Sequence, residues 1–121
     1  MAYITILPKS VEVQQRLTQD CVAVMNIIHQ AVKTVFNVAA NDIIVELNQC
    51  VTIAFNPSAI EALAVPDVVI KIATSDHEFR PKFQTLCDHV LDSWNATFED
   101  PLKLEVWVDV IDTWGCNIDL D

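Results

Sequence analysis

The stretches NVAANDIIVEL (37–47) and NATFEDPLKLEV (95–106) are two variants of one joint between a helix and a strand. Each begins at an asparagine, reaches an aspartate five residues later, and then enters a segment of β-branched or alternating apolar residues. Apolar residues at helical spacing precede both stretches, and a strand-like segment precedes each helix, at 2–6 and at 67–73. The sequence therefore predicts one strand–helix–strand unit that occurs twice.

Two segments have the periodicity of amphipathic helices. The first begins at Ser10, which is a good candidate for an N-cap, and continues to Phe36 as one long helix. The second ends near Phe98. The apolar positions of the two helices are Val13, Leu17, Cys21, Val24, Ile28, Ala31 and Val35, and then Phe83, Leu86, Cys87, Val90, Leu91, Trp94 and Phe98. Each helix can bury this apolar stripe against a sheet.

Four segments are typical of β-strands, and a fifth is similar to them. The four are AYITI (2–6), IIVEL (43–47), DVVIKIA (67–73) and PLKLEVWVDVI (101–111). The third is nearly all apolar, which favours a central strand buried on both faces. The fifth, CVTIAF (50–55), is expected either to continue the second strand or to form the return arm of a hairpin. Residues 56–63 are expected to form a loop with one helical turn.

The order of these elements predicts the architecture. Right-handed crossovers place both helices on the same side of the sheet, so we expect an α+β fold with a mixed four-stranded sheet. The two units span about 1–60 and 66–121, and together they form a single domain, 1–121. We expect the other face of the sheet to be apolar. Because no sequence remains to cover it, other copies of the chain are the expected partners.

Composition excludes several classes of function. The net charge is −10 with seven Lys and Arg residues, so the clustered positive charge that nucleic acids and anionic membranes require is missing. The four cysteines form no CxxC pair, the three histidines are widely spaced, and a single glycine leaves no phosphate-binding loop. We therefore expect no metal and no cofactor. No apolar run is long enough to span a membrane, and no secretory signal is recognisable, which favours a cytoplasmic oligomer.

The chain resembles the tautomerase superfamily. The residues that carry the resemblance are AYITILP (2–8), NVAANDIIVEL (37–47) and LEVWVDVIDTWGCN (104–117), within a duplicated plan of 121 residues. The chain is most similar to the long-subunit branch, which includes macrophage migration inhibitory factor and carboxymethyl-hydroxymuconate isomerase. The resemblance implies a homotrimer whose sheets form a barrel, with active sites at subunit boundaries around each chain start.

The same resemblance implies a catalytic amine at residue 2. The family uses a proline directly after the initiator methionine, and this chain has Ala2 there. An alanine amine has an ordinary pKa of about 7.7–8.0, which suits proton transfer near neutral pH. That amine exists only after Met1 is removed. With Met1 in place, the Ala2 nitrogen is an amide.

The expected substrate contacts are few because the chain has few cations. Arg80, helped by Lys71 or His77, is the candidate for holding a substrate carboxylate, since arginine offers a planar fork of donors. Trp107 is the candidate for an apolar pocket wall, and Asp109 could orient a water or a proton. The alternatives are structural roles. Arg80 would then be a solvent-exposed residue at the start of the second helix, and Trp107 and Asp109 would form contacts between subunits.

Three functions remain open at this point. The first is an isomerase-type enzyme that moves a proton on a small keto–enol or unsaturated organic acid. The second is a catalytically silent trimer of the same fold that acts as a binding or interaction module. The third is a different duplicated domain, ferredoxin-like, that works as a dimeric small-molecule sensor.

Overall fold

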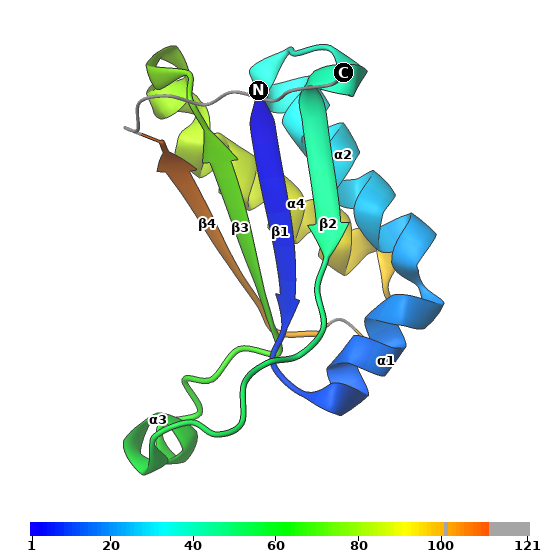
Figure 1. Cartoon of the computed structure of the whole chain (residues 1–121), viewed down its shortest axis with the longest axis vertical. Coiled ribbons are helices and arrows are strands. Elements are labelled where there is room, and N and C mark those ends of the chain that lie inside the picture. The colour runs from blue at the N-terminus through cyan, green and yellow to red at the C-terminus, as the bar shows by residue number, and fades with distance from the viewer. Residues whose placement is uncertain (101, 112–121) are drawn as a thin grey trace, which may run out of the picture.

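A computed structural model describes residues 1–100 and 102–111 of the chain. It contains one four-stranded sheet in the order β2-β1-β3-β4, covered by helices on one face (Figure 1). The strands are β1 (Ala2–Pro8), β2 (Ile43–Leu47), β3 (Val68–Thr74) and β4 (Leu104–Val110). The helices are α1 (Val11–Gln19), α2 (Cys21–Phe36), α3 (Pro57–Glu61) and α4 (Phe83–Thr97), with short 3-10 turns η1 (Ala40–Asp42) and η2 (His77–Lys82). The predicted α+β class and the mixed four-stranded sheet are confirmed.

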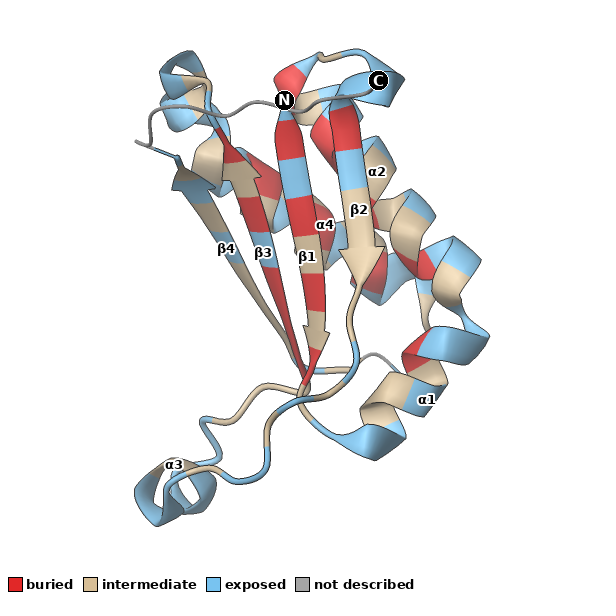
Figure 2. Cartoon of the chain, in the orientation of Figure 1, coloured by how far each residue is buried: buried red, intermediate tan, exposed pale blue. Residues whose placement is uncertain are grey.

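The two strand–helix–strand units meet at the centre of the sheet. β1 pairs in parallel with β2, β3 pairs in parallel with β4, and β1 and β3 join the units as antiparallel neighbours. Alternate residues of β1 and β3 point to the helices and are fully buried, which produces the striped pattern of Figure 2. The core between sheet and helices is made by Ile4, Ile6, Val24, Ile28, Val32, Phe36, Ile70, Ile72, Leu86, Val90 and Trp94.

The prediction of one helix over residues 10–36 is wrong at a single position. Asp20 has φ −103° and ψ 20°, so α1 ends before it and α2 begins after it. Aspartate competes with the helix for backbone hydrogen bonds and favours helix termini, which explains why the break falls here. The apolar spacing continues across the break, since Leu17 and Val24 are both buried in the same core. Ser10 caps α1 as predicted, accepting a hydrogen bond from the Val13 amide at 3.1 Å.

The prediction of a strand at residues 50–55 is also wrong. The amide of Asn48 donates to the Ile6 carbonyl at 3.0 Å, and the chain then leaves the sheet. A continuation of β2 would need a partner beyond Pro8, where β1 ends, and the chain does not turn back along the free outer edge of β2. Residues 50–55 therefore have no strand in this chain, and Ile53 is 99% exposed. The helical turn expected within 56–63 is present as α3.

The open face of the sheet carries both polar and apolar residues. The expectations of an apolar open face and of a third strand buried on both faces are therefore wrong. Lys71 of β3 is exposed there, so β3 is buried only on the helix side of its middle residues. The residues that alternate with the core positions are Tyr3, Thr5, Ile44, Glu46, Val69, Lys71, Glu105, Trp107 and Asp109. Charged and hydroxyl groups at six of these nine positions keep the face hydrated.

The last part of the family-like stretch 104–117 lies outside the described residues from position 112 onward. Among the described residues, no helix has the length and apolar character needed to cross a membrane.

The core assignment makes a direct prediction for two isoleucines. Ile4→Ala removes a fully buried side chain from β1 and is expected to lower the free energy of unfolding by roughly 2–5 kcal/mol. The same substitution at Ile53, which contacts little but solvent, is expected to change it by less than about 0.5 kcal/mol. Denaturant unfolding followed by circular dichroism measures both. Equal losses would contradict the core described here.

Candidate functional site

The start of the chain lies at one end of the sheet, between two carboxylates. The Met1 ammonium is 3.3 Å from Oδ2 of Asp42 and 3.4 Å from Oδ2 of Asp76. The three groups are roughly half exposed, so the ion pairs are accessible to solvent and contribute little to stability. In Figure 1 this end of the sheet carries the N label, the start of β2 and the ends of β3 and β4.

Strand pairing explains why these two aspartates meet the amine. Asp42 directly precedes β2, which pairs in parallel with β1 so that Ile43 lies opposite Ala2. Asp76 follows β3, which pairs antiparallel so that Thr74 lies opposite Ala2. The Asp76 amide donates to Oγ1 of the buried Thr74 at 3.1 Å, which holds the turn in place. One carboxylate is therefore delivered from each neighbour of β1.

The predicted catalytic residue, Ala2, is the first residue of β1 and only 2% exposed. Because Met1 is attached, the nitrogen of Ala2 is an amide and the free amine belongs to Met1, one residue farther out. Met1 is partly exposed, whereas Ala2 packs with the core. Removal of Met1 would therefore move the amine from an accessible position to the margin of the apolar core.

Three of the predicted substrate contacts lie on the open face of the sheet. Lys71 of β3 is directly opposite Trp107 of β4 in the strand register, and Asp109 is two residues farther along β4 on the same face. Trp107 is 54% exposed, so its ring offers a flat apolar surface next to the Lys71 side chain. The structure therefore places these three residues on one surface.

The other two predicted contacts, His77 and Arg80, lie on η2. This turn begins directly after Asp76, and both side chains are exposed. Its neighbour Lys82 lies over the Phe79 ring, 5.7 Å from the centroid, and Phe79 stacks on Phe36 of the core. The turn is thus anchored by its aromatic residue, and its Arg80 side chain is exposed to solvent.

Sequence reasoning missed the most distinctive contacts of this region, the aspartates around the chain start and a tyrosine–glutamate pair. The Tyr3 hydroxyl donates to Oε2 of Glu46 at 2.6 Å, across the parallel β1–β2 pair on the open face. No sequence motif identifies such pairs. They can be identified only from the strand register, because the pairing of β2 with β1 brings Asp42 and Glu46 next to β1.

The hydrogen bond changes the acidity of Tyr3. Its pKa is raised above the ordinary value of 10.0, first because the phenol proton is held by Glu46, then through burial and the negative charge of the same carboxylate. Tyr3 is therefore a neutral hydrogen-bond donor at physiological pH and no general base.

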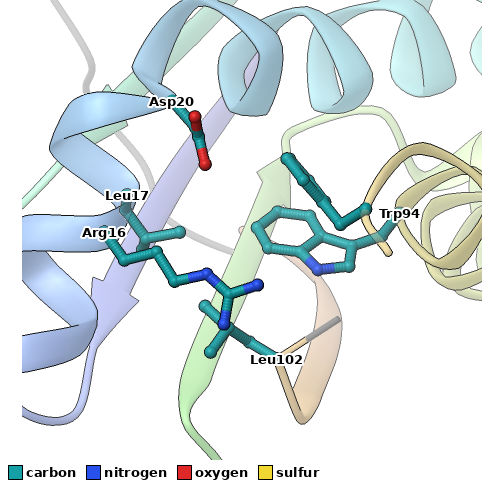
Figure 3. A pocket seen from close by; sticks show the side chains of 6 residues that line it. Arg16, Leu17, Asp20, Trp94 and Leu102 are labelled. Carbon is teal, nitrogen blue, oxygen red and sulfur yellow. The ribbon is translucent and has the colours of Figure 1, made fainter. Parts of the chain in front are cut away.

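A hollow lies between α1 and α4, and it is too small to be a substrate site. It is lined by Arg16, Leu17, Asp20, Trp94, Phe98 and Leu102 and has a volume of ≈ 10 Å³ (Figure 3). That space is about one water molecule. The buried indole N–H of Trp94 has no hydrogen-bond acceptor among the described residues, and it lies beside this hollow. The Arg16 guanidinium closes the hollow by donating to the Asp100 carbonyl.

The described residues contain no group of three or more His, Cys, Asp or Glu side chains arranged to hold a metal ion. The two aspartates at the chain start are a pair around an amine.

Comparison with known proteins gives a likeness in structure and no match in sequence. No family model matches the chain, and no curated protein matches it in sequence. Among solved structures, the chain is similar to the crystal structure of a macrophage migration inhibitory factor-like protein from Entamoeba histolytica. The two are 13% identical, the match covers 96% of this chain and 93% of the other, and the TM-score is 0.49. A likeness of this degree concerns the fold and carries nothing about activity.

The Tyr3–Glu46 pair predicts a shift in a titration that one residue reports, since Tyr3 is the only tyrosine of the chain. Glu46→Gln removes the carboxylate and is expected to lower the Tyr3 pKa toward 10.0, as measured by the ultraviolet absorbance of the tyrosinate. Because the folded pKa is raised, the pair's contribution to stability is complete below pH 10.0 and is lost as the pH rises through the folded value.

Glu105→Gln is the matched control for this titration, because it removes a carboxylate from the same face of the sheet but from β4. It should leave the Tyr3 titration unchanged. An unchanged titration in Glu46→Gln would show that the hydrogen bond is not formed in solution.

Proposed function

We propose that this chain is a tautomerase-superfamily protein that moves a proton on a small keto–enol or unsaturated organic acid. The proton acceptor is the amine of Ala2, which is freed when Met1 is removed. The observation that carries this proposal is the position of the chain start, at the end of an inner strand with a carboxylate on either side.

The chemistry needs an amine that is neutral part of the time and a site that excludes water. α-Amino groups ordinarily have a pKa of about 7.7–8.0, so a useful fraction is neutral near physiological pH. Ala2 lies at the margin of the core, where its amine would be less hydrated than the Met1 amine is. Asp42 and Asp76 lie 3.3 Å and 3.4 Å from the Met1 nitrogen, so they would also lie near the amine of Ala2.

The substrate would lie along the open face, next to the chain start. In this proposal Arg80 holds the substrate carboxylate with help from Lys71 or His77, Trp107 forms an apolar wall, and Asp109 orients a water or a proton. The placement of Lys71 and Trp107 as direct neighbours on β3 and β4 supports this arrangement. The resemblance described above adds the assembly, a homotrimer that completes each site at a subunit boundary. We further propose a cytoplasmic location. The net charge of −10 supports the absence of nucleic-acid and membrane partners.

A second function is favoured by a separate observation. Ala2 stands where the family has its catalytic proline, and the Met1 amine is held in two ion pairs. If Met1 is retained, the chain is a catalytically silent trimer that serves as a binding or interaction module.

An assay of phenylpyruvate keto–enol conversion separates the two functions. Protein shown by mass spectrometry to lack Met1 is expected to exceed the buffer rate by about tenfold or more, because a general base typically contributes 10²–10⁴-fold. Protein that retains Met1 is the control and is expected to stay at the buffer rate. Ala2→Pro without Met1 should be at least as active as the Ala2 form.

Buffer-level rates in both the Met1-free and the Ala2→Pro proteins would exclude the enzymatic function and leave the silent module. The assembly is tested independently by light scattering coupled to size-exclusion chromatography. A monomer or a dimer would contradict the homotrimer.

A further inference from the structure

An exposed arm leaves the sheet at the end opposite the chain start. We define the arm as residues 48–66, which include α3. Figure 1 shows it projecting beyond the lower ends of the strands, and Figure 2 shows no buried residue along it. Its exposed aliphatic side chains include Leu63, which is 80% exposed. So much apolar surface on one projecting segment indicates a place where something binds.

The arm and the residue that precedes β4 line a cavity that is open to solvent. The cavity has a volume of ≈ 380 Å³ and is lined by Phe55, Ile60, Leu63, Val65 and Lys103. This volume is within the range of small-molecule sites, which are mostly apolar with one or a few polar groups that orient the ligand. Here the polar group is the side chain of Lys103.

Leu63, which lines the cavity, occupies a backbone position after α3 that normally suits glycine. α3 ends in a Schellman arrangement, in which the Leu63 amide donates to the Ile60 carbonyl and the Ala64 amide donates to the Ala59 carbonyl. Leu63 occupies the left-handed position with φ 54°, a conformation that a Cβ atom disfavours. Leu63 is therefore strained, exposed and part of the cavity lining.

Lys103 is held in place by two contacts that leave part of its ammonium free to bind. Its Nζ donates to the Leu63 carbonyl, and an ammonium has three N–H donors. Its amide donates to Oδ2 of Asp67 at 2.8 Å, so that carboxylate is engaged by the backbone. Lys103 is the only charged residue in the lining. An apolar cavity with one cation is complementary to an apolar molecule that ends in one anionic group.

We propose that this cavity binds an apolar monocarboxylate, such as a fatty acid of about ten carbons, whose carboxylate accepts hydrogen bonds from Lys103. The alkyl chain lies against Phe55, Ile60 and Leu63. The site is separate from the chain start, because Lys103 precedes the beginning of β4 and the chain-start site is at the opposite end of the sheet. The proposal therefore does not depend on the function proposed above.

Isothermal titration of the full chain tests the proposal with decanoate and with N-decanoyl-N-methylglucamine, which carries the same acyl chain on a neutral and soluble head group. We expect decanoate to bind with a dissociation constant on the order of 1 mM, and the neutral amphiphile to bind about tenfold more weakly because it lacks the charge. Equal affinity of the two would overturn the role of Lys103. No binding of decanoate would overturn the site.

Variants locate the binding on the chain. Lys103→Met keeps the length of the side chain and removes the charge, and it is expected to weaken decanoate binding about tenfold. Leu63→Gly suits the left-handed backbone and removes part of the wall, so it should fold and bind about fivefold more weakly. Lys33→Met, on the exposed side of α2, is the matched control and should bind as the unaltered chain does.

Equal weakening in Lys33→Met and Lys103→Met would show that the overall charge, rather than this cavity, decides binding. An apparent affinity that falls as the protein concentration rises would show that a second copy of the chain covers the arm, which also overturns the proposal.

Discussion

The antiparallel pairing of β1 with β3 is the interaction on which the rest of the structure depends. It joins two strand–helix–strand units that each pair in parallel within themselves, and it places the first residue of the chain opposite the end of β3. Apart from Val69, the buried residues of the sheet then fall on the side where α2 and α4 lie. The chain start, the two aspartates beside it and the open face receive their positions from the same register.

Much of this architecture follows from the sequence, because the information is local. Alternating or β-branched runs specify the four strands, and helical periodicity specifies α2 and α4. The duplicated joints at Asn37 and Asn95 then restrict the topology, since right-handed crossovers leave few arrangements of two such units. Ser10 could be recognised as a cap because capping depends on the residue itself and the three that follow.

The errors arise where the outcome depends on distant residues. Periodicity cannot reveal the break at Asp20, because one residue outside the helix barely shifts the apolar stripe. The segment 50–55 has the composition of a strand, yet a strand requires a partner, and β1 ends at Pro8, before it could pair with a continuation of β2. The candidate site could not be predicted from the sequence either, because its residues are distant along the chain. Asp42, Asp76 and Glu46 become neighbours of β1 only through pairing, whereas the candidates chosen by residue type, such as Arg80 and His77, lie on an exposed turn.

The internal duplication relates the two ends of the sheet by an approximate two-fold axis between β1 and β3. Ala2 pairs with Ile43 in the first unit as Val68 pairs with Leu104 in the second, so Met1 corresponds to Asp67 and Asp42 corresponds to Lys103. In the first unit the cation comes before β1 and the carboxylate before β2, and in the second unit the order of charges is reversed. The two units therefore carry opposite arrangements of charge at corresponding ends of their strand pairs. Only the first could ever carry a free backbone amine, since the second is closed by the peptide bond that makes the chain continuous.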